Sequence, residues 1–207
     1  MTDVLLGADG RPKCRWPLGD ELYEDYHDAE WGRGWDDDIV LYEKIALEGF
    51  QAGLSWITVL RKRAAFRDAF AGFDPDVVAK YGDREVEAML SNAGIIRHRG
   101  KIESAINNAK RAIEMIEEFG SLAAYCWRFA AAASQTAPRS FEDLAAITEA
   151  STALSKGLKR RGWSFVGPTT MHAFMQAAGM VNDHLVGCWA REPCERRRLD
   201  LVARYAG

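Results

Sequence analysis

Apolar residues return at helical spacing along most of this chain. The clearest run lies between residues 101 and 118, and Gly120 follows it as a stop signal. Its apolar positions are Ile102, Ala105, Ile106, Ala109, Ile113 and Ile116. No segment keeps the period of two that marks a half-buried strand. The pattern therefore predicts an all-α fold with little or no sheet.

Capping residues divide the remaining chain into further helices. Three aspartates at 36–38 precede an apolar face that continues through Leu41 and Ile45 to position 48, since carboxylates accept hydrogen bonds from the free N–H groups of a first turn. After a glycine-containing break at 51–54, the other predicted helices cover about 55–70, 74 onward, 83–90, 101–118, 121 onward, 151–161, 168–178 and 183–188. The loosest stretch, 134–148, is a candidate loop between two helical subdomains.

The composition is that of an ordinary globular protein. Of the 207 residues, 48% are hydrophobic and 28% are charged, which excludes collagen, disordered tails and disulfide scaffolds. No segment approaches the roughly 20 apolar residues of a membrane helix, and the opening sequence lacks the pattern of an export signal. We therefore expect one domain, residues 1–207, in the cytoplasm and without a membrane partner. The four cysteines should stay reduced there.

The net charge of −3 gives no general reason to expect a polyanionic partner, so any nucleic-acid site has to be local. Residues 156–170 read as a helix, a glycine-bounded hairpin and a second helix, with four cations upstream of the hairpin. The N–H groups at such a helix start can bind a phosphate oxygen. Residues 97–101 form a second basic segment. Each segment alone can simply complement a helix dipole, but two of them in an acidic protein favour contact with a DNA backbone.

Residues that commonly bind metals lie near both ends of the chain. Twelve residues lie between Cys14 and His27, whereas His184 and Cys188 have the spacing of neighbours on one helix face. Two cysteines and two histidines match a closed, tetrahedral, structural zinc site. The alternative is a pair of buried thiols and two ordinary histidines. Cys194 is a possible substitute ligand.

Glu48 lies on the apolar face that carries Leu41 and Ile45. A buried carboxylate is costly unless something specific pairs with it, so this position indicates a ligand-binding or acid–base role. The alternative is a solvated side chain paired with Lys44. Aromatic residues that can stack on a planar, cationic base crowd the same quarter of the chain. They are Trp16, Tyr23, Tyr26, Trp31, Trp35, Tyr42, Phe50 and Trp56.

Several blocks carry these features in a characteristic order. They are Cys14-Arg15-Trp16, YEDYHDAEWG at 23–32, LEGFQAGLSWITVL at 47–60, NAGIIRHRGKI at 92–102, residues 154–167, and FMQAAGMVNDHLVGC at 174–188. Over about residues 12–190 the chain resembles the 3-methyladenine DNA glycosylase I family, bacterial enzymes of the helix-hairpin-helix superfamily. The resemblance implies an enzyme that flips 3-methyladenine out of alkylated double-stranded DNA and hydrolyses its N-glycosidic bond, leaving an abasic site.

The resemblance also implies a role for individual residues. Zinc ligands fall on Cys14, His27, His184 and Cys188, and the catalytic, base-recognising glutamate falls on Glu48. The base pocket falls on Trp16, Tyr23, Tyr26, Trp31 and Trp56. The DNA contacts fall on Gly53 and Leu54, which fill the gap in the duplex, and on the hairpin residues Gly162, Phe165, Gly167 and Thr169.

Further expectations follow from the resemblance. The enzyme should be a monomer without strand-cleaving activity, built as one catalytic domain or as two helical subdomains around the active-site cleft. Asp183 has no assigned role, and the arginines of residues 190–207 either contact phosphates or belong to a solvated tail. Two alternatives compete with this interpretation. One is a non-catalytic, zinc-stapled DNA-damage-binding protein, and the other is a metallohydrolase with an open zinc position.

Overall fold

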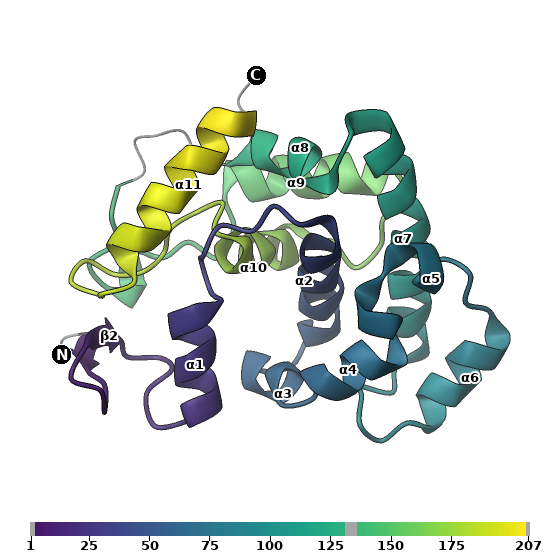
Figure 1. Cartoon of the computed structure of the whole chain (residues 1–207), viewed down its shortest axis with the longest axis horizontal. Coiled ribbons are helices and arrows are strands. Elements are labelled where there is room, and N and C mark those ends of the chain that lie inside the picture. The colour runs from purple at the N-terminus through teal and green to yellow at the C-terminus, as the bar shows by residue number, and fades with distance from the viewer. Residues whose placement is uncertain (1–2, 131–135, 206–207) are drawn as a thin grey trace.

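A computed structural model of the chain describes residues 3–130 and 136–205. The fold is mostly helical, as predicted (Figure 1). In chain order the elements are β1 (Val4–Leu6), β2 (Pro12–Cys14), α1 (Glu21–Ala29), α2 (Asp38–Gln51), α3 (Trp56–Leu60), α4 (Arg63–Ala69), η1 (Ala71–Phe73), α5 (Pro75–Val78), α6 (Asp83–Ser91), α7 (Arg99–Phe119), α8 (Leu122–Cys126), η2 (Trp127–Phe129), η3 (Phe141–Asp143), α9 (Glu149–Arg160), α10 (Pro168–Ala178) and α11 (Arg191–Tyr205). None of the described helices combines the length and the apolarity needed to cross a bilayer.

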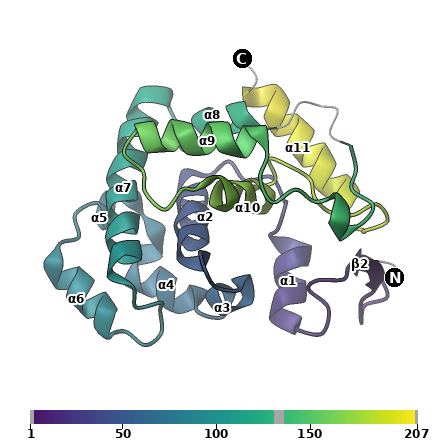
Figure 2. The same ribbon diagram turned by 180° about the vertical axis from the view of Figure 1, so that it is seen from behind.

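Helix α2 lies at the centre of the molecule, with α7, α8 and α10 packed around it (Figures 1 and 2). All its residues from Leu41 to Phe50 are buried. The predicted aspartate start is confirmed, because the carboxylate of Asp37 accepts a hydrogen bond from the N–H of Val40 at 3.0 Å. Asp38 accepts another from the N–H of Leu122 at 2.8 Å, which joins the start of α2 to the start of α8.

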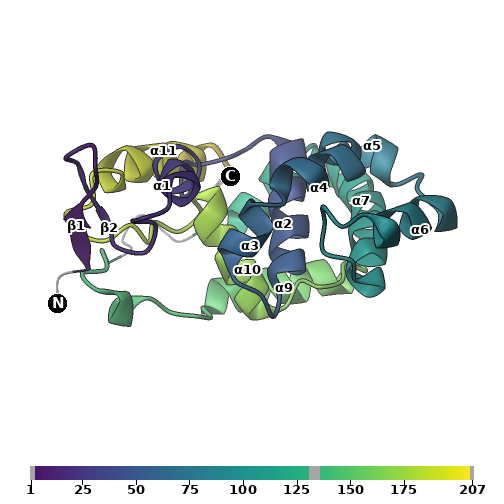
Figure 3. The same cartoon turned by 90° about the horizontal axis from the view of Figure 1, so that it is seen from below.

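The two ends of the chain meet on one side of the molecule, where β1, β2, α1 and α11 lie together (Figure 3). The strands pair antiparallel with Val4 opposite Cys14, which agrees with the expectation of little sheet. The N–H of Trp189 donates to the carbonyl of Pro12 at 2.9 Å. Segments that are far apart in the sequence therefore form one unit beside α2.

The predictions of two helices are wrong. The helix expected over 55–70 is divided into α3 and α4 by a turn, where the Lys62 ammonium donates to the carbonyl of Ala93 at 2.8 Å. The helix expected over 183–188 does not form, because tertiary partners take its backbone donors. The N–H of Leu185 donates to the Cys14 sulfur at 3.4 Å, and the N–H of Val186 donates to the carbonyl of Pro138 at 2.8 Å.

The arginine-rich C-terminal segment is a helix in which Arg196 is exposed, so the hypothesis of a solvated tail is wrong only for the arginines that contact other protein groups. In α11, Arg198 is fully buried and pairs with Glu195 at 2.5 Å, and Arg197 pairs with Asp36 at 2.9 Å. Arg191 donates to the carbonyl of Asn182 at 3.0 Å and so supports the loop before α11. These side chains are used inside the protein, which leaves them poorly placed for phosphate contacts.

The predicted loop over 134–148 has only the short η3 within its described part, and positions 134 and 135 lie outside the described residues. Its carbonyl at Pro138 holds the segment after α10, as noted above. The loop thus connects the helical core with the unit formed by the chain ends.

We predict that Gly179→Ala destabilises the protein much more than Gly120→Ala. Both glycines end a helix in the left-handed conformation, with φ of +81° and +84°, which costs other residues roughly 1–2 kcal/mol. A Cβ on Gly179 would lie 2.5 Å from the nitrogen of Gly34, whereas a Cβ on Gly120 meets nothing within 4 Å. Urea unfolding followed by circular dichroism should show a loss of roughly 3 kcal/mol or more for Gly179→Ala. Equal losses in the two variants would contradict this close approach.

Candidate active site and metal centre

Glu48 is buried in the last turn and a half of α2, with 5% of its surface exposed, so the solvated alternative is wrong. One of its carboxylate oxygens, Oε2, has no hydrogen-bond partner among the described residues. Burial raises the pKa of Glu48 to about 8, and the nearby Lys44 ammonium opposes this rise only in part. Because a buried carboxyl group is costly without a hydrogen-bond partner, this oxygen is expected to find its partner in a bound ligand.

Aromatic side chains line the same cavity as Glu48. Tyr23 and Tyr26 come from α1, Trp16 and Trp31 flank that helix, and Trp56 starts α3. The Trp16 ring meets Tyr23 edge-on at 4.7 Å and Trp31 edge-on at 5.2 Å. The Tyr26 and Trp56 rings lie 5.3 Å apart. The five aromatic residues that the resemblance assigned to the base pocket therefore line one cavity, whereas Trp35, Tyr42 and Phe50 belong to the main core or pack against it.

This cavity has a volume of about 280 Å³ and is lined mainly by apolar atoms. Its lining residues are Trp16, Tyr23, Tyr26, Trp31, Glu48, Gln51, Trp56, Phe141, Leu144, Ala173 and Gln176. Sequence reasoning missed Gln51, Phe141, Leu144, Ala173 and Gln176. The helical spacing of Gln51 from Glu48 could have indicated the first of these, whereas Phe141 and Leu144 come from a loop without any pattern.

Asp183 lies behind this cavity. Its carboxylate accepts a hydrogen bond from the Gln176 side-chain amide at 2.7 Å, and it lies 3.6 Å from the ring of His172. Because Gln176 itself lines the cavity, Asp183 orients a lining residue and does not form part of the lining described above.

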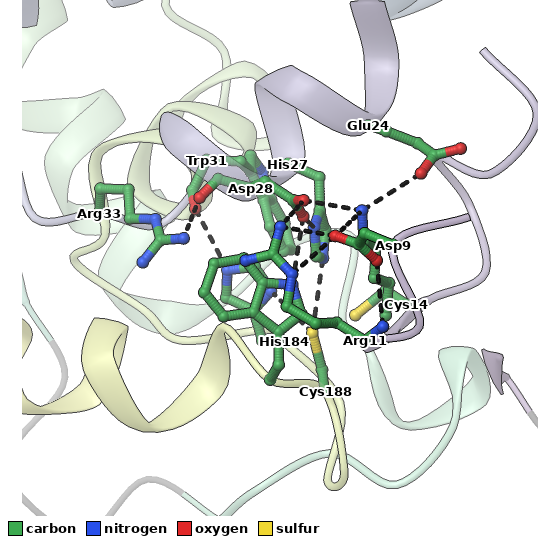
Figure 4. Close-up of polar contacts among 12 residues, drawn as sticks. Asp9, Arg11, Cys14, Glu24, His27, Asp28, Trp31, Arg33, His184 and Cys188 are labelled. Atoms are coloured by element: carbon green, nitrogen blue, oxygen red, sulfur yellow. Dashed lines mark hydrogen bonds and ion pairs between the residues drawn. The ribbon is translucent and has the colours of Figure 1, made fainter. Parts of the chain in front are cut away.

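Cys14, His27, His184 and Cys188 form a buried cluster that can hold a metal ion. Their four potential ligand atoms all lie within 4.8 Å of one another (Figure 4). The two pairs come from opposite ends of the chain and meet between α1 and the loop after α10. Cys194 does not belong to this set, so it is not a substitute ligand, and Cys126 is buried in the main core.

The histidines of the cluster are oriented as in metal sites. Nδ1 of His27 lies 2.8 Å from a carboxylate oxygen of Asp28, and Nε2 of His184 lies 3.1 Å from the carbonyl oxygen of Trp31. The remaining ring nitrogens both face the sulfur of Cys188, at 3.5 and 3.6 Å. An acceptor on the outer nitrogen fixes the tautomer in which the inner nitrogen can bind a cation.

The charges of the cluster favour the same conclusion. A hydrogen bond with Cys14, supported by His184 and His27, lowers the pKa of the Cys188 thiol, and the same pairing raises the pKa of Cys14. Burial lowers the pKa of His184, which keeps its ring neutral. A thiolate and neutral imidazoles are the forms that bind metal cations. The residues present therefore fit a metal ion.

The cluster also supports the aromatic wall of the cavity. The Trp16 ring packs edge-on against His27 at 5.3 Å, and the Trp31 ring packs edge-on against His184 at 4.6 Å. Two of the lining tryptophans are therefore held in place by two of the candidate ligands.

The turn after α2 and the connection between α9 and α10 carry the other predicted site residues. Gly53 has a φ of +85° and no neighbour that would meet a Cβ, and the following Leu54 is 42% exposed. In the second connection Gly162 has a φ of +83°, and Phe165 combines a φ of +53° with 40% exposure. Gly167 precedes the first turn of α10, where Thr169 is exposed.

Comparison with known proteins identifies the family. The family model for methyladenine glycosylases matches residues 16–192. DNA-3-methyladenine glycosylase 1 of Escherichia coli is 48% identical over 177 residues, which is 85% of this chain and 95% of that protein. DNA-3-methyladenine glycosylase of Haemophilus influenzae is 44% identical over 186 residues, or 88% of this chain and 97% of that protein. A crystal structure of a 3-methyladenine DNA glycosylase I variant in complex with 3-methyladenine, 31% identical, superposes with a TM-score of 0.83 over 86% of this chain and 97% of that one.

The helical architecture, the aromatic cavity beside Glu48 and these relatives together place the chain among the DNA glycosylases. The chain belongs to the methyladenine glycosylase family.

We predict that Glu48→Gln stabilises the protein increasingly as the pH rises from 5 to 8. Between its usual pKa of 4.5 and the folded value of about 8, Glu48 loses its proton in the unfolded chain but keeps it in the folded protein. The free energy of unfolding therefore falls with rising pH, by at most about 1.4 kcal/mol per pH unit from this group. Lys44, whose pKa burial lowers to about 8, adds its own dependence only above this range.

Urea unfolding of both proteins, followed by tryptophan fluorescence at several pH values, checks this expectation. The difference between variant and wild type should be small at pH 5 and should widen steadily toward pH 8. Parallel pH profiles would contradict the assigned burial of the carboxyl group.

Proposed function

We propose that this protein is a DNA-3-methyladenine glycosylase that hydrolyses the N-glycosidic bond of 3-methyladenine in alkylated double-stranded DNA and leaves an abasic site. The observation that carries the proposal is the buried carboxyl group of Glu48, with one free oxygen, inside a cavity walled by aromatic rings. The names of the relatives support the same substrate.

Methylation at N3 makes the purine cationic, so the base is already a good leaving group and needs little protonation by the enzyme. Aromatic faces attract a cationic ring, and the carboxylate of Glu48 can accept a hydrogen bond from its exocyclic amine. Trp16, Tyr23, Tyr26, Trp31 and Trp56 would enclose the base and exclude water from the carboxylate. Binding a cation beside Glu48 also favours the ionised form of that carboxyl group.

A base can enter this cavity only after it leaves the stacked duplex. Leu54, exposed on the turn that follows α2, is the apolar wedge that would occupy the gap, and Gly53 lets the turn approach the duplex. The connection between α9 and α10 would serve as the hairpin of a helix-hairpin-helix unit. Gly162, Phe165, Gly167 and Thr169 would present their backbone and side-chain donors to the phosphates there.

We assign a single structural zinc ion to Cys14, His27, His184 and Cys188. Four protein ligands fill a tetrahedral coordination sphere, so such an ion joins the chain ends and leaves no position for an activated water. This ligand count opposes the metallohydrolase alternative. The chemistry would instead depend on Glu48 and the aromatic wall.

A further property follows from the cavity. Its lining within the described residues contains no lysine, which supports a monofunctional glycosylase that does not cleave the strand. We also propose that the protein is a monomer forming one catalytic domain. We place the activity in the bacterial cytoplasm, where the DNA substrate lies.

We predict that the wild-type protein releases 3-methyladenine from methylated duplex DNA and that Glu48→Gln lowers this rate by about a hundredfold, because an electrostatic contact to the cationic base is lost. The released bases would be separated by chromatography, and 7-methylguanine should remain in the DNA. Glu43→Gln is the matched control, since Glu43 is also buried on α2 but pairs with Arg67 at 2.8 Å outside the cavity.

If the folded, metal-loaded wild type released no base, the non-catalytic DNA-damage-binding protein would become the better interpretation. Equal losses in Glu43→Gln and Glu48→Gln would point to general disturbance of α2.

We predict that the purified protein holds about one zinc ion per chain and that Cys188→Ala loses it, because a three-ligand site binds the ion far more weakly. Elemental analysis after dialysis gives the stoichiometry, and thermal unfolding should show a clear decrease in Tm. Cys126→Ala, which changes a buried thiol outside the cluster, should retain the ion. Full zinc retention in Cys188→Ala would overturn the ligand assignment.

A further inference from the structure

Helix α7 has a buried polar face. Lys101, Ser104 and Asn108 are 8%, 6% and 3% exposed, and their spacing of three and four residues places them in one row along the helix. Buried polar side chains are costly unless they are paired, so their partners indicate what this face does. The partners lie at the C-terminal end of α2 and on the connection between α9 and α10.

Lys101 holds the end of α2. Its ammonium donates to the carbonyl oxygens of Phe50 at 2.8 Å and Ala52 at 2.6 Å. The last carbonyls of a helix have no partner within the helix, and a cation there also complements the helix dipole. Ala52 directly precedes Gly53 and Leu54, so this contact fixes the point from which the exposed turn departs.

Ser104 and Asn108 hold the connection between α9 and α10, which runs alongside α7 (Figure 2). The Ser104 hydroxyl donates to the carbonyl of Ser164 at 3.1 Å. The Asn108 amide donates to the same carbonyl and accepts from the N–H of Ser164, both at 3.0 Å. This two-way pairing fixes both the position and the direction of the chain just before Phe165.

The two connections also touch each other. A Cβ added to Gly49 of α2 would lie 3.4 Å from the Cβ of Phe165, so the connection is seated directly on α2 one turn before Ala52. The basic segment 97–101 was expected to contact the DNA backbone, but its Lys101 points into the protein. The cation is therefore used between two protein segments and is withdrawn from the surface.

We propose that Lys101 is a positioning residue that, together with Ser104 and Asn108, sets the spacing between the Leu54 turn and the Phe165 hairpin, so that one duplex contacts both. The proposal rests on the proposed function, because it assigns both connections to DNA. Lys101 acts through the carbonyls of Phe50 and Ala52 and touches neither the base nor the reacting bond.

The test uses Lys101→Met, which removes the donors but keeps the apolar stem. We expect KM for methylated duplex DNA, and Kd for a duplex with an abasic site, to rise about tenfold. The affinity for free 3-methyladenine, measured by tryptophan fluorescence, should stay within about twofold, because the cavity itself is unchanged. Lys101→Arg, which keeps a cation with several donors, should recover part of the duplex affinity.

Lys110→Met is the matched control. Lys110 is exposed on the same helix, and nine residues from Lys101 correspond to the opposite face, so this variant loses the same charge without the contact. It should bind the abasic duplex within about twofold of wild type.

A double-mutant cycle with Leu54→Ala separates positioning from general destabilisation. If Lys101 acts through the turn, the two losses in duplex affinity overlap, and the double variant is little worse than the worse single one. Fully additive losses, unchanged duplex affinity in Lys101→Met, or an equal loss of free-base affinity would each overturn the proposal. If Lys101→Met does not fold, Lys101→Gln, which can still donate to one carbonyl, takes its place in the cycle.

Failure of the proposed function gives a different result. If the wild type binds the abasic duplex but releases no base, the glycosylase proposal is contradicted. The role of Lys101 is still decided in that case, because it depends on how the Lys101 variants bind the abasic duplex.

Discussion

The burial of α2 on all sides is the constraint on which the rest of the structure depends. Ten consecutive residues of this helix, Leu41–Phe50, are shielded from solvent, so its polar side chains need partners inside the protein. Glu43 pairs with Arg67, and Lys44 lies 5.4 Å from the Trp35 ring. Glu48 alone among them keeps a carboxylate oxygen without a partner. The same packing that stabilises the core therefore leaves one carboxylate oxygen of Glu48 without a protein partner, and in the proposed function the base supplies that partner.

The second constraint is the meeting of the two chain ends behind the cavity. Trp16 and Trp31, which form part of the wall, pack against His27 and His184 of the cluster. These histidines are held in turn by Asp28 and by the carbonyl of Trp31. A metal ion in this cluster would thus determine the shape of the cavity without taking part in the reaction. In the proposed function, a closed, structural ion would thus support the residues that touch the base.

Local patterns allowed prediction of the features that depend on neighbouring residues. Helical spacing and the aspartate caps identified α2 and α7, and the apolar neighbours of Glu48 made its burial one of two alternatives, between which the structure decides. Features that depend on distant partners were missed. The loop at 183–188 is not helical because Cys14 and Pro138 accept its N–H groups. Phe141 reaches the cavity from a loop that Asp3, at the other end of the sequence, holds through a hydrogen bond of 3.0 Å. No periodicity contains this information, because each partner comes from a remote segment.

The charge of the base explains how one cavity can select damaged adenine. With a pKa of about 8, Glu48 is mostly protonated near neutral pH while the cavity is empty. Ionising it beside a neutral adenine would leave an uncompensated negative charge in an apolar site, which is strongly unfavourable. A methylated, cationic base supplies the opposite charge at the place where the carboxylate forms. In the proposed function, the base that is easiest to release is thus also the base whose charge favours the ionised, hydrogen-bond-accepting form of Glu48. The aromatic wall adds to this preference because its rings attract the same positive charge.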